Sequence, residues 1–149
     1  MQATDVKVED VNAVLVRHRG VRGLRRLQTA LGLVDGGSES PYETLTRILL
    51  VRNGFPRPTT QIRVCDDEGF VVARLDMGWP EWRVGVDFDG AHHWTDPKQR
   101  SKDVERYARL PELGWSVVRL TSSMLHNDQR TFVDRVGRTL TARGCPQTW

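Results

Sequence analysis

Cysteine is scarce in this sequence, and long hydrophobic runs are absent from it. Among 149 residues only Cys65 and Cys145 are cysteines, far apart and without CxxC spacing. No apolar stretch approaches the roughly 20 residues that span a bilayer, and Met1–Asp10 lacks the apolar core of a signal peptide. We therefore expect no disulfide framework, no structural zinc knuckle and no membrane association, and the expected location is the cytoplasm.

A large excess of charge of either sign is also missing. The net charge is +3, which permits nucleic-acid binding without establishing it. The apolar fraction of 38% and the charged fraction of 28% suit one folded globular domain rather than a disordered chain. Basic residues gather in two stretches, Arg17–Arg26 and Lys98–Arg109. Most clusters of this kind are solvated faces, and that alternative stays open for each.

The spacing of apolar and turn residues predicts an α/β fold. Residues 1–37 form a predicted helical N-terminal extension, with helices near Val6–Val16 and Val21–Leu33. Residues 38–149 form the predicted main domain, in the order helix, three-strand meander, helix, strand, helix. We expect the fourth strand to join the meander after a helical crossover. The expected elements are a helix from Pro41 to Asn53, strands Gln61–Cys65, Phe70–Met77 and Arg83–Asp89, a helix from Pro97 to about Pro111, strand Ser116–Leu120 and helix Arg130–Ala142.

Acidic residues occupy the second and third predicted strands, where aspartate is unfavourable unless something neutralises it. A hairpin symmetric about Glu81 and Trp82 places Asp76 directly across from Asp87, on one face of the sheet. A divalent cation would turn their repulsion into attraction, and carboxylates suit Mg²⁺. The alternative is a solvated sheet face on which these acids pair with Arg74 or Arg83.

Other residues near this hairpin have two interpretations as well. His92 and His93 are candidates for proton transfer beside a carboxylate cluster, although isolated histidines are more often surface residues. Glu43 occupies the capping-box position of the helix that Ser40 begins, and it could serve the acidic site too.

Several short motifs follow one another along the chain. They are Ser40–Glu43, Leu75-Asp76, Val86–Gly90 with His92 and His93, Asp103 with Arg106, and Gly114–Leu120. In this order they resemble the bacterial very-short-patch-repair-like endonuclease domains of the PD-(D/E)xK superfamily. The resemblance covers roughly Ser38 to Leu140; each motif is weak by itself, and the combined order is fairly specific.

The resemblance implies a restriction endonuclease-like core and Mg²⁺-dependent hydrolysis of DNA phosphodiesters, with Mn²⁺ as a substitute. It implies that Asp76 and Asp87 ligate the metal and that Glu43 is an added helix acid. The superfamily lysine belongs at Asp89, so His92, His93, Lys98 or Lys102 is expected to replace it. Asp89 is then a candidate for orienting the attacking water.

The predicted function is therefore that of a metal-dependent endodeoxyribonuclease acting in repair or defence. Its DNA-contacting residues recur along one face of the predicted crossover helix and would meet phosphates: Lys98, Lys102, Arg106 and Arg109. Two alternatives stay open. One is an inactive nucleic-acid- or partner-binding module of the same fold, and the other is a toxin or phage-defence component. A protein partner or a homodimer is compatible with each.

Overall fold

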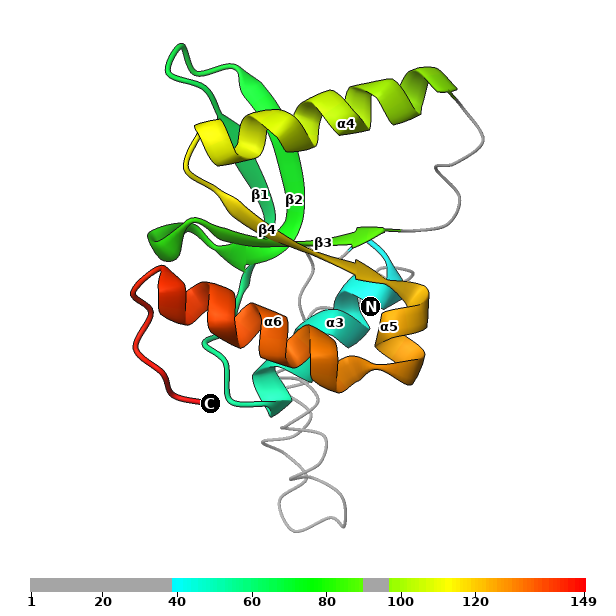
Figure 1. Ribbon diagram of the computed structural model, residues 1–149, viewed down its shortest axis with the longest axis vertical. Helices are drawn as coiled ribbons and strands as arrows, with labels where there is room; N and C mark the ends of the chain where they lie inside the picture. The colour runs from blue at the N-terminus through cyan, green and yellow to red at the C-terminus, as the bar shows by residue number, and fades with distance from the viewer. Residues whose placement is uncertain (1–38, 90–96) are drawn as a thin grey trace, which may run out of the picture. The chain divides into compact units, whose positions relative to one another are not determined.

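A four-stranded mixed sheet lies at the centre of the computed structural model, which describes residues 39–89 and 97–149, without the side chains of 97–103. The strands lie side by side in chain order. The first three are antiparallel, and the fourth is parallel to the third (Figure 1). The predicted α/β class and the helical crossover are confirmed. The strands are β1 (Thr59–Cys65), β2 (Val71–Trp79), β3 (Val84–Asp89) and β4 (Ser116–Thr121).

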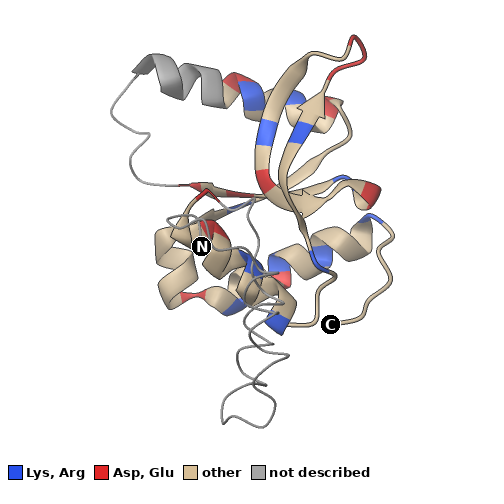
Figure 2. Cartoon of the chain, turned by 180° about the vertical axis from the view of Figure 1, so that it is seen from behind, with Lys and Arg blue, Asp and Glu red and all other residues tan. Residues whose placement is uncertain are grey.

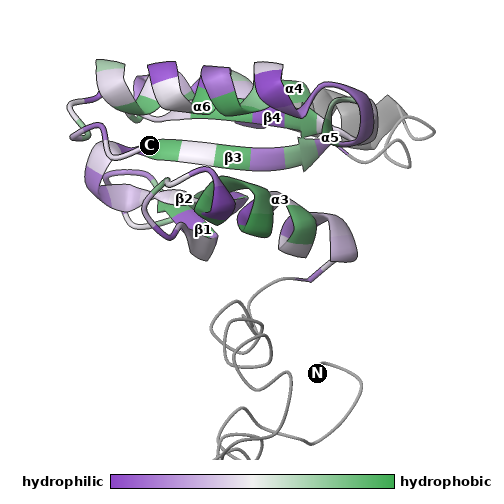
Figure 3. Ribbon diagram, turned by 90° about the horizontal axis from the view of Figure 1, so that it is seen from below, coloured by the Kyte–Doolittle hydropathy of each residue, from purple (hydrophilic) through white to green (hydrophobic). Residues whose placement is uncertain are grey.

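Helices cover both faces of this sheet. The crossover helix α4 (Pro97–Glu112) packs against β2 and β4 on one face. On the other face lie α3 (Pro41–Arg52), α5 (Ser122–Asn127) and α6 (Gln129–Ala142), and Figure 3 shows β3 running between α6 and α3. The arrangement is thus a sheet between two unequal helical layers.

Two hydrophobic clusters correspond to these two layers. The larger one joins the sheet to α3, α5 and α6, and it contains Leu50, Val86, Leu120 and Phe132 among its buried residues. The smaller one lies under α4 and contains Ile62, Val64, Ala73, Leu75 and Leu110. Because a strand points successive side chains to opposite faces, Val84 and Val86 of β3 belong to the larger cluster, whereas Gly85 between them faces Leu75 of the smaller one.

Helix α3 begins and ends where the sequence predicts. Ser40 is the N-cap, and its hydroxyl oxygen accepts a hydrogen bond from the backbone N–H of Glu43 at 3.1 Å. Pro41 occupies the first turn, where its missing N–H costs nothing. The helix ends before Gly54, whose φ of +87° is one that glycine adopts without strain.

The structure corrects the expected boundaries of the acidic hairpin. Residues from Gly78 were predicted to be a turn, but β2 continues through Trp79, and Gly78 pairs with Gly85 of β3. The connection shrinks to one 3-10 turn, Pro80–Trp82, followed by Arg83 at φ +50°. Two facing glycines permit the close approach that extends the strands. The short helix α5 was not predicted, although Thr121 caps it through its side chain.

The predicted N-terminal extension, residues 1–37, lies outside the described residues. Within the part that is described, no helix is both long and apolar enough to cross a membrane.

Gly78 provides a test of this hairpin. A Cβ atom there would lie 2.2 Å from the backbone oxygen of Val84, so Gly78→Ala must push the two strands apart. We expect the free energy of unfolding to fall by about 3 kcal/mol or more in a denaturant titration. The control Gly69→Ala has an unfavourable φ of +87° but open space around it, and it should cost only about 1–2 kcal/mol. Equal losses for the two variants would contradict the close packing at Gly78.

Candidate functional site

The carboxylates of Asp76 and Asp87 each accept a hydrogen bond from the backbone of the opposite strand of the hairpin. The regular pairing of β2 with β3 ends at Met77 and Val86, in the register that the sequence predicts. One residue further, Asp87 Oδ1 accepts a hydrogen bond from the Asp76 backbone N–H at 3.2 Å. In return Asp76 Oδ2 accepts one from the Phe88 N–H at 2.7 Å. Side-chain oxygens thus take the place of backbone partners and bring two carboxylates together.

The environment of Asp76 strongly favours its neutral form. Burial is the largest cause, followed by the charge of Asp87, and together with Glu43 they raise the pKa of Asp76 from 3.8 to about 7. The hydrogen bond from Phe88 acts in the opposite direction and offsets only part of this shift. A carboxyl group whose pKa is raised by burial and by neighbouring acids is a candidate for a functional site.

Glu43 joins this pair from the first turn of α3. Its side chain is 6% exposed, and its Oε2 accepts a hydrogen bond from Gln61 Nε2 of β1 at 3.0 Å. Gln61 has a φ of +54°, which is rare for a residue with a side chain and indicates local strain. The charges of Asp87 and Glu43 both act on Asp76, so the sequence-predicted Glu43, Asp76 and Asp87 form one cluster. Figure 2 shows acidic segments of α3, β2 and β3 near one another.

Asp87 is also held from α4. Its Oδ2 accepts hydrogen bonds from Arg106 Nη2, at 2.9 Å, and from the Tyr107 hydroxyl. Asp87 is 5% exposed, so these contacts supply charge compensation inside the protein. Burial, followed by the charge of Asp87, raises the pKa of Tyr107 well above its usual range, which keeps the hydroxyl protonated as a donor.

Asp89 lies apart from this cluster of three acids. Its Oδ2 accepts a hydrogen bond from Arg119 Nη2 of β4 at 2.6 Å, and that guanidinium lies 4.5 Å from the centre of the Tyr107 ring. The position that the resemblance assigns to a lysine therefore holds a carboxylate with its own cationic partner.

Of the remaining predicted site residues, Arg106 and Arg109 have described side chains. Arg109 forms an exposed ion pair with Asp66 at 3.6 Å, at the turn between β1 and β2, which contributes little to stability. Arg106 points into the cluster, as described. His92 and His93, as well as the side chains of Lys98 and Lys102, lie outside the described residues, so their predicted roles stay predictions.

Three contributors to this site were not singled out in the sequence: Tyr107, Gln61 and Arg119. The parallel register offers a signal for Arg119, because it pairs β4 with β3 so that Arg119 lies beside Asp87. Gln61 has no such signal, since its position depends on an unusual φ.

The donor atoms of this cluster suit a hard divalent cation. Glu43, Asp76 and Asp87 offer carboxylate oxygens, and the buried Gln61 Oε1 has no hydrogen-bond partner among the described residues. Their geometry is incomplete, because no three acidic, histidine or cysteine side chains in residues 39–89 and 104–149 are arranged to hold a metal. At Asp87, Oδ2 already accepts hydrogen bonds from Arg106 and Tyr107.

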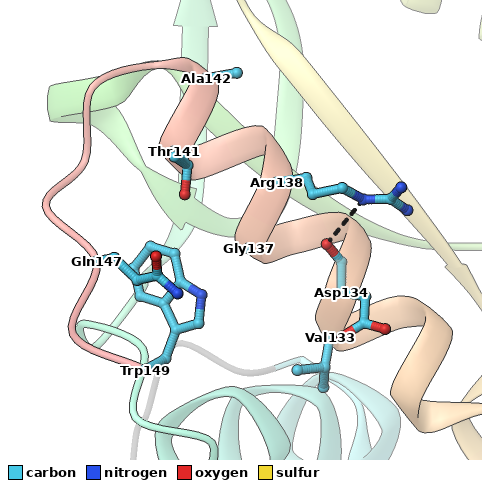
Figure 4. Close-up of a pocket in the computed structure, with 8 residues that line it drawn as sticks. All are labelled: Val133, Asp134, Gly137, Arg138, Thr141, Ala142, Gln147 and Trp149. Carbon is cyan, nitrogen blue, oxygen red and sulfur yellow. Dashed lines mark hydrogen bonds between the residues drawn. The ribbon is translucent and has the colours of Figure 1, made fainter.

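A separate hollow lies between α6 and the C-terminal segment (Figure 4). Its volume is about 700 Å³, and Trp149 lines it together with Asp134, Gly137 and Arg138. Trp149 stacks on Phe55 with the ring centres 4.6 Å apart, so it anchors this segment to the larger core cluster. None of the predicted site residues lines the hollow.

Comparison with known proteins finds distant relatives only. The uncharacterized proteins MT2308 and Rv2248, from two strains of Mycobacterium tuberculosis, are each 26% identical to the chain over 131 residues. The match covers 88% of this chain and 48% of each relative, so the chain spans about half the length of these relatives. No family profile and no solved structure matches the chain.

The pKa of Asp76 gives a test by pH. Because the folded state holds this proton up to about pH 7 and an unfolded aspartate releases it near 3.8, the stabilisation is present below pH 3.8 and is lost as pH rises to 7. We expect Asp76→Asn to remove this decline and to be more stable than the wild type at pH 8. Urea titrations at several pH values measure it, with the exposed Asp67→Asn as control. Parallel pH profiles for wild type and Asp76→Asn would contradict the assignment.

Proposed function

We propose that residues 38–149 form a metal-dependent nuclease domain with a restriction endonuclease-like core, which hydrolyses phosphodiester bonds of DNA. The observation that carries this proposal is the convergence of Glu43, Asp76 and Asp87 from three separate elements. A structural role alone gives no reason to bring three carboxylates together at the cost of the raised pKa of Asp76.

The order of elements supports the same proposal. The chain from Ser40 runs helix, three antiparallel strands, crossover helix and parallel strand. That order is the one the resemblance implies, and it brings the helix acid Glu43 close to the hairpin acids. The short helix α5 is an addition before the final helix.

Asp76 and Asp87 would hold Mg²⁺ or Mn²⁺, with Glu43 as a further ligand or as a base for water. When bound, such a cation polarises the phosphate and lowers the pKa of water. On the protein side, the tyrosine hydroxyl of Tyr107 and the Phe88 N–H orient the two carboxylates. Figure 2 shows basic segments among acidic ones on the described part of α4, and the basic residues would attract the DNA backbone.

A second candidate is a nucleic-acid-binding or partner-binding module without catalysis. The contacts that favour it are those of Arg106 and Tyr107 with Asp87, because they satisfy this carboxylate without any metal. This candidate predicts salt-dependent DNA binding without cleavage.

Cleavage of plasmid DNA tests the proposal. Purified wild-type protein with Mg²⁺ or Mn²⁺ is expected to nick supercoiled plasmid, and Asp76→Ala is expected to lower the rate by about 100-fold or more, since it removes a metal ligand. Asp67→Ala, which removes an exposed turn carboxylate, should keep the wild-type rate. A gel assay of supercoiled and open-circular DNA measures all three.

Each outcome separates the candidates. Equal nicking by the wild type and Asp76→Ala would mean that this site is not responsible. DNA binding without nicking by a folded wild type, at any concentration of Mn²⁺, would favour the binding module.

A further inference from the structure

A divalent cation at Oδ2 of Asp87 would compete with the partners that this oxygen already has. Its Oδ1 already accepts from the Asp76 N–H, and its Oδ2 accepts from Arg106 and from Tyr107. A guanidinium and a metal ion are both positive, so they repel each other when they share one carboxylate oxygen. The two cations therefore compete for Oδ2 of Asp87.

Arg106 is the partner that is able to leave. Its side chain is 29% exposed, whereas that of Asp87 is 7% exposed, so the guanidinium has a path to solvent. It also lies 4.7 Å from the centre of the Tyr107 ring and contacts the Tyr107 hydroxyl at 3.0 Å. These contacts would keep a displaced guanidinium beside the site. The Tyr107 hydroxyl, in contrast, is a neutral donor that does not repel a cation.

We propose that Arg106 is a built-in counter-ion of Asp87 that competes with the divalent cation, so that metal binding requires the guanidinium to leave Asp87. This inference rests on the proposed metal-dependent function and adds the control of its metal affinity. Without metal, the guanidinium of Arg106 neutralises the carboxylate of Asp87 and so stabilises the folded site. With metal, the released guanidinium lies next to the acids, where a substrate phosphate would arrive.

Arg119 provides a matched control for this competition. Like Arg106, Arg119 contacts Tyr107 of α4. The central carbon of its guanidinium lies 4.5 Å from the centre of the Tyr107 ring. Its ion pair is with Asp89 and not with Asp87. Loss of either arginine removes one positive charge near the acids, but only Arg106 occupies an oxygen of the proposed metal ligands.

The test is the affinity for Mn²⁺ itself, measured by isothermal titration calorimetry on the full chain at pH 8. Arg106→Gln is expected to bind Mn²⁺ about tenfold or more tightly than the wild type, which is a gain of about 1.4 kcal/mol. Arg119→Gln should gain clearly less, because it changes only the long-range field. Arg106→Lys, which keeps the charge, should lie between the wild type and Arg106→Gln, and it replaces Arg106→Gln if that variant does not fold.

The failures of the two proposals are distinguishable. If the wild type binds Mn²⁺ and nicks DNA but Arg106→Gln binds no more tightly than Arg119→Gln, the competition is overturned and the nuclease proposal stands. If none of the folded variants binds Mn²⁺, both the competition and the metal-dependent function are overturned. Mn²⁺ binding that appears only in Arg106→Gln would support the competition in its strongest form.

Discussion

Two carboxylates facing each other across a hairpin are the constraint on which the rest of this site depends. Asp76 and Asp87 each accept a hydrogen bond from the backbone of the opposite strand, at the point where the regular ladder stops. The contacts fix both side chains, but they also bring like charges together in a buried place. Glu43 adds to this negative charge, and cationic side chains offset part of it.

The crossover helix and the last strand supply the offsetting charge. Arg106 and Tyr107 of α4 contact Asp87, and Arg119 of β4 contacts Asp89. Both arginines flank the Tyr107 ring, so one aromatic side chain aligns two cations against two acids. Burial, followed by the negative charges of Asp87 and Glu43, raises the pKa of Asp76 to about 7. A cation bound at Asp76 would offset this cost of ionising the carboxyl group.

Much of the fold follows from patterns that a sequence displays. The cap at Ser40 and the short connection between the first two strands are local, and each was predicted where it occurs. The length of β2 was not, because Gly78 resembles a turn residue unless its contact with Gly85 is known. The facing of Asp76 and Asp87 was predictable from symmetry of the hairpin. The contacts of Arg106 and Tyr107 were not, because they depend on how α4 crosses the sheet.

The central claim is that the acidic pair is a cation site held closed by an arginine. A crystal structure of the protein soaked with Mn²⁺, with anomalous diffraction data, tests it most directly. The account predicts an anomalous peak within bonding distance of both Asp76 and Asp87, with the Arg106 guanidinium moved away from Asp87 Oδ2. The absence of a peak at these carboxylates under saturating Mn²⁺, with Arg106 still bound to Asp87, would contradict it.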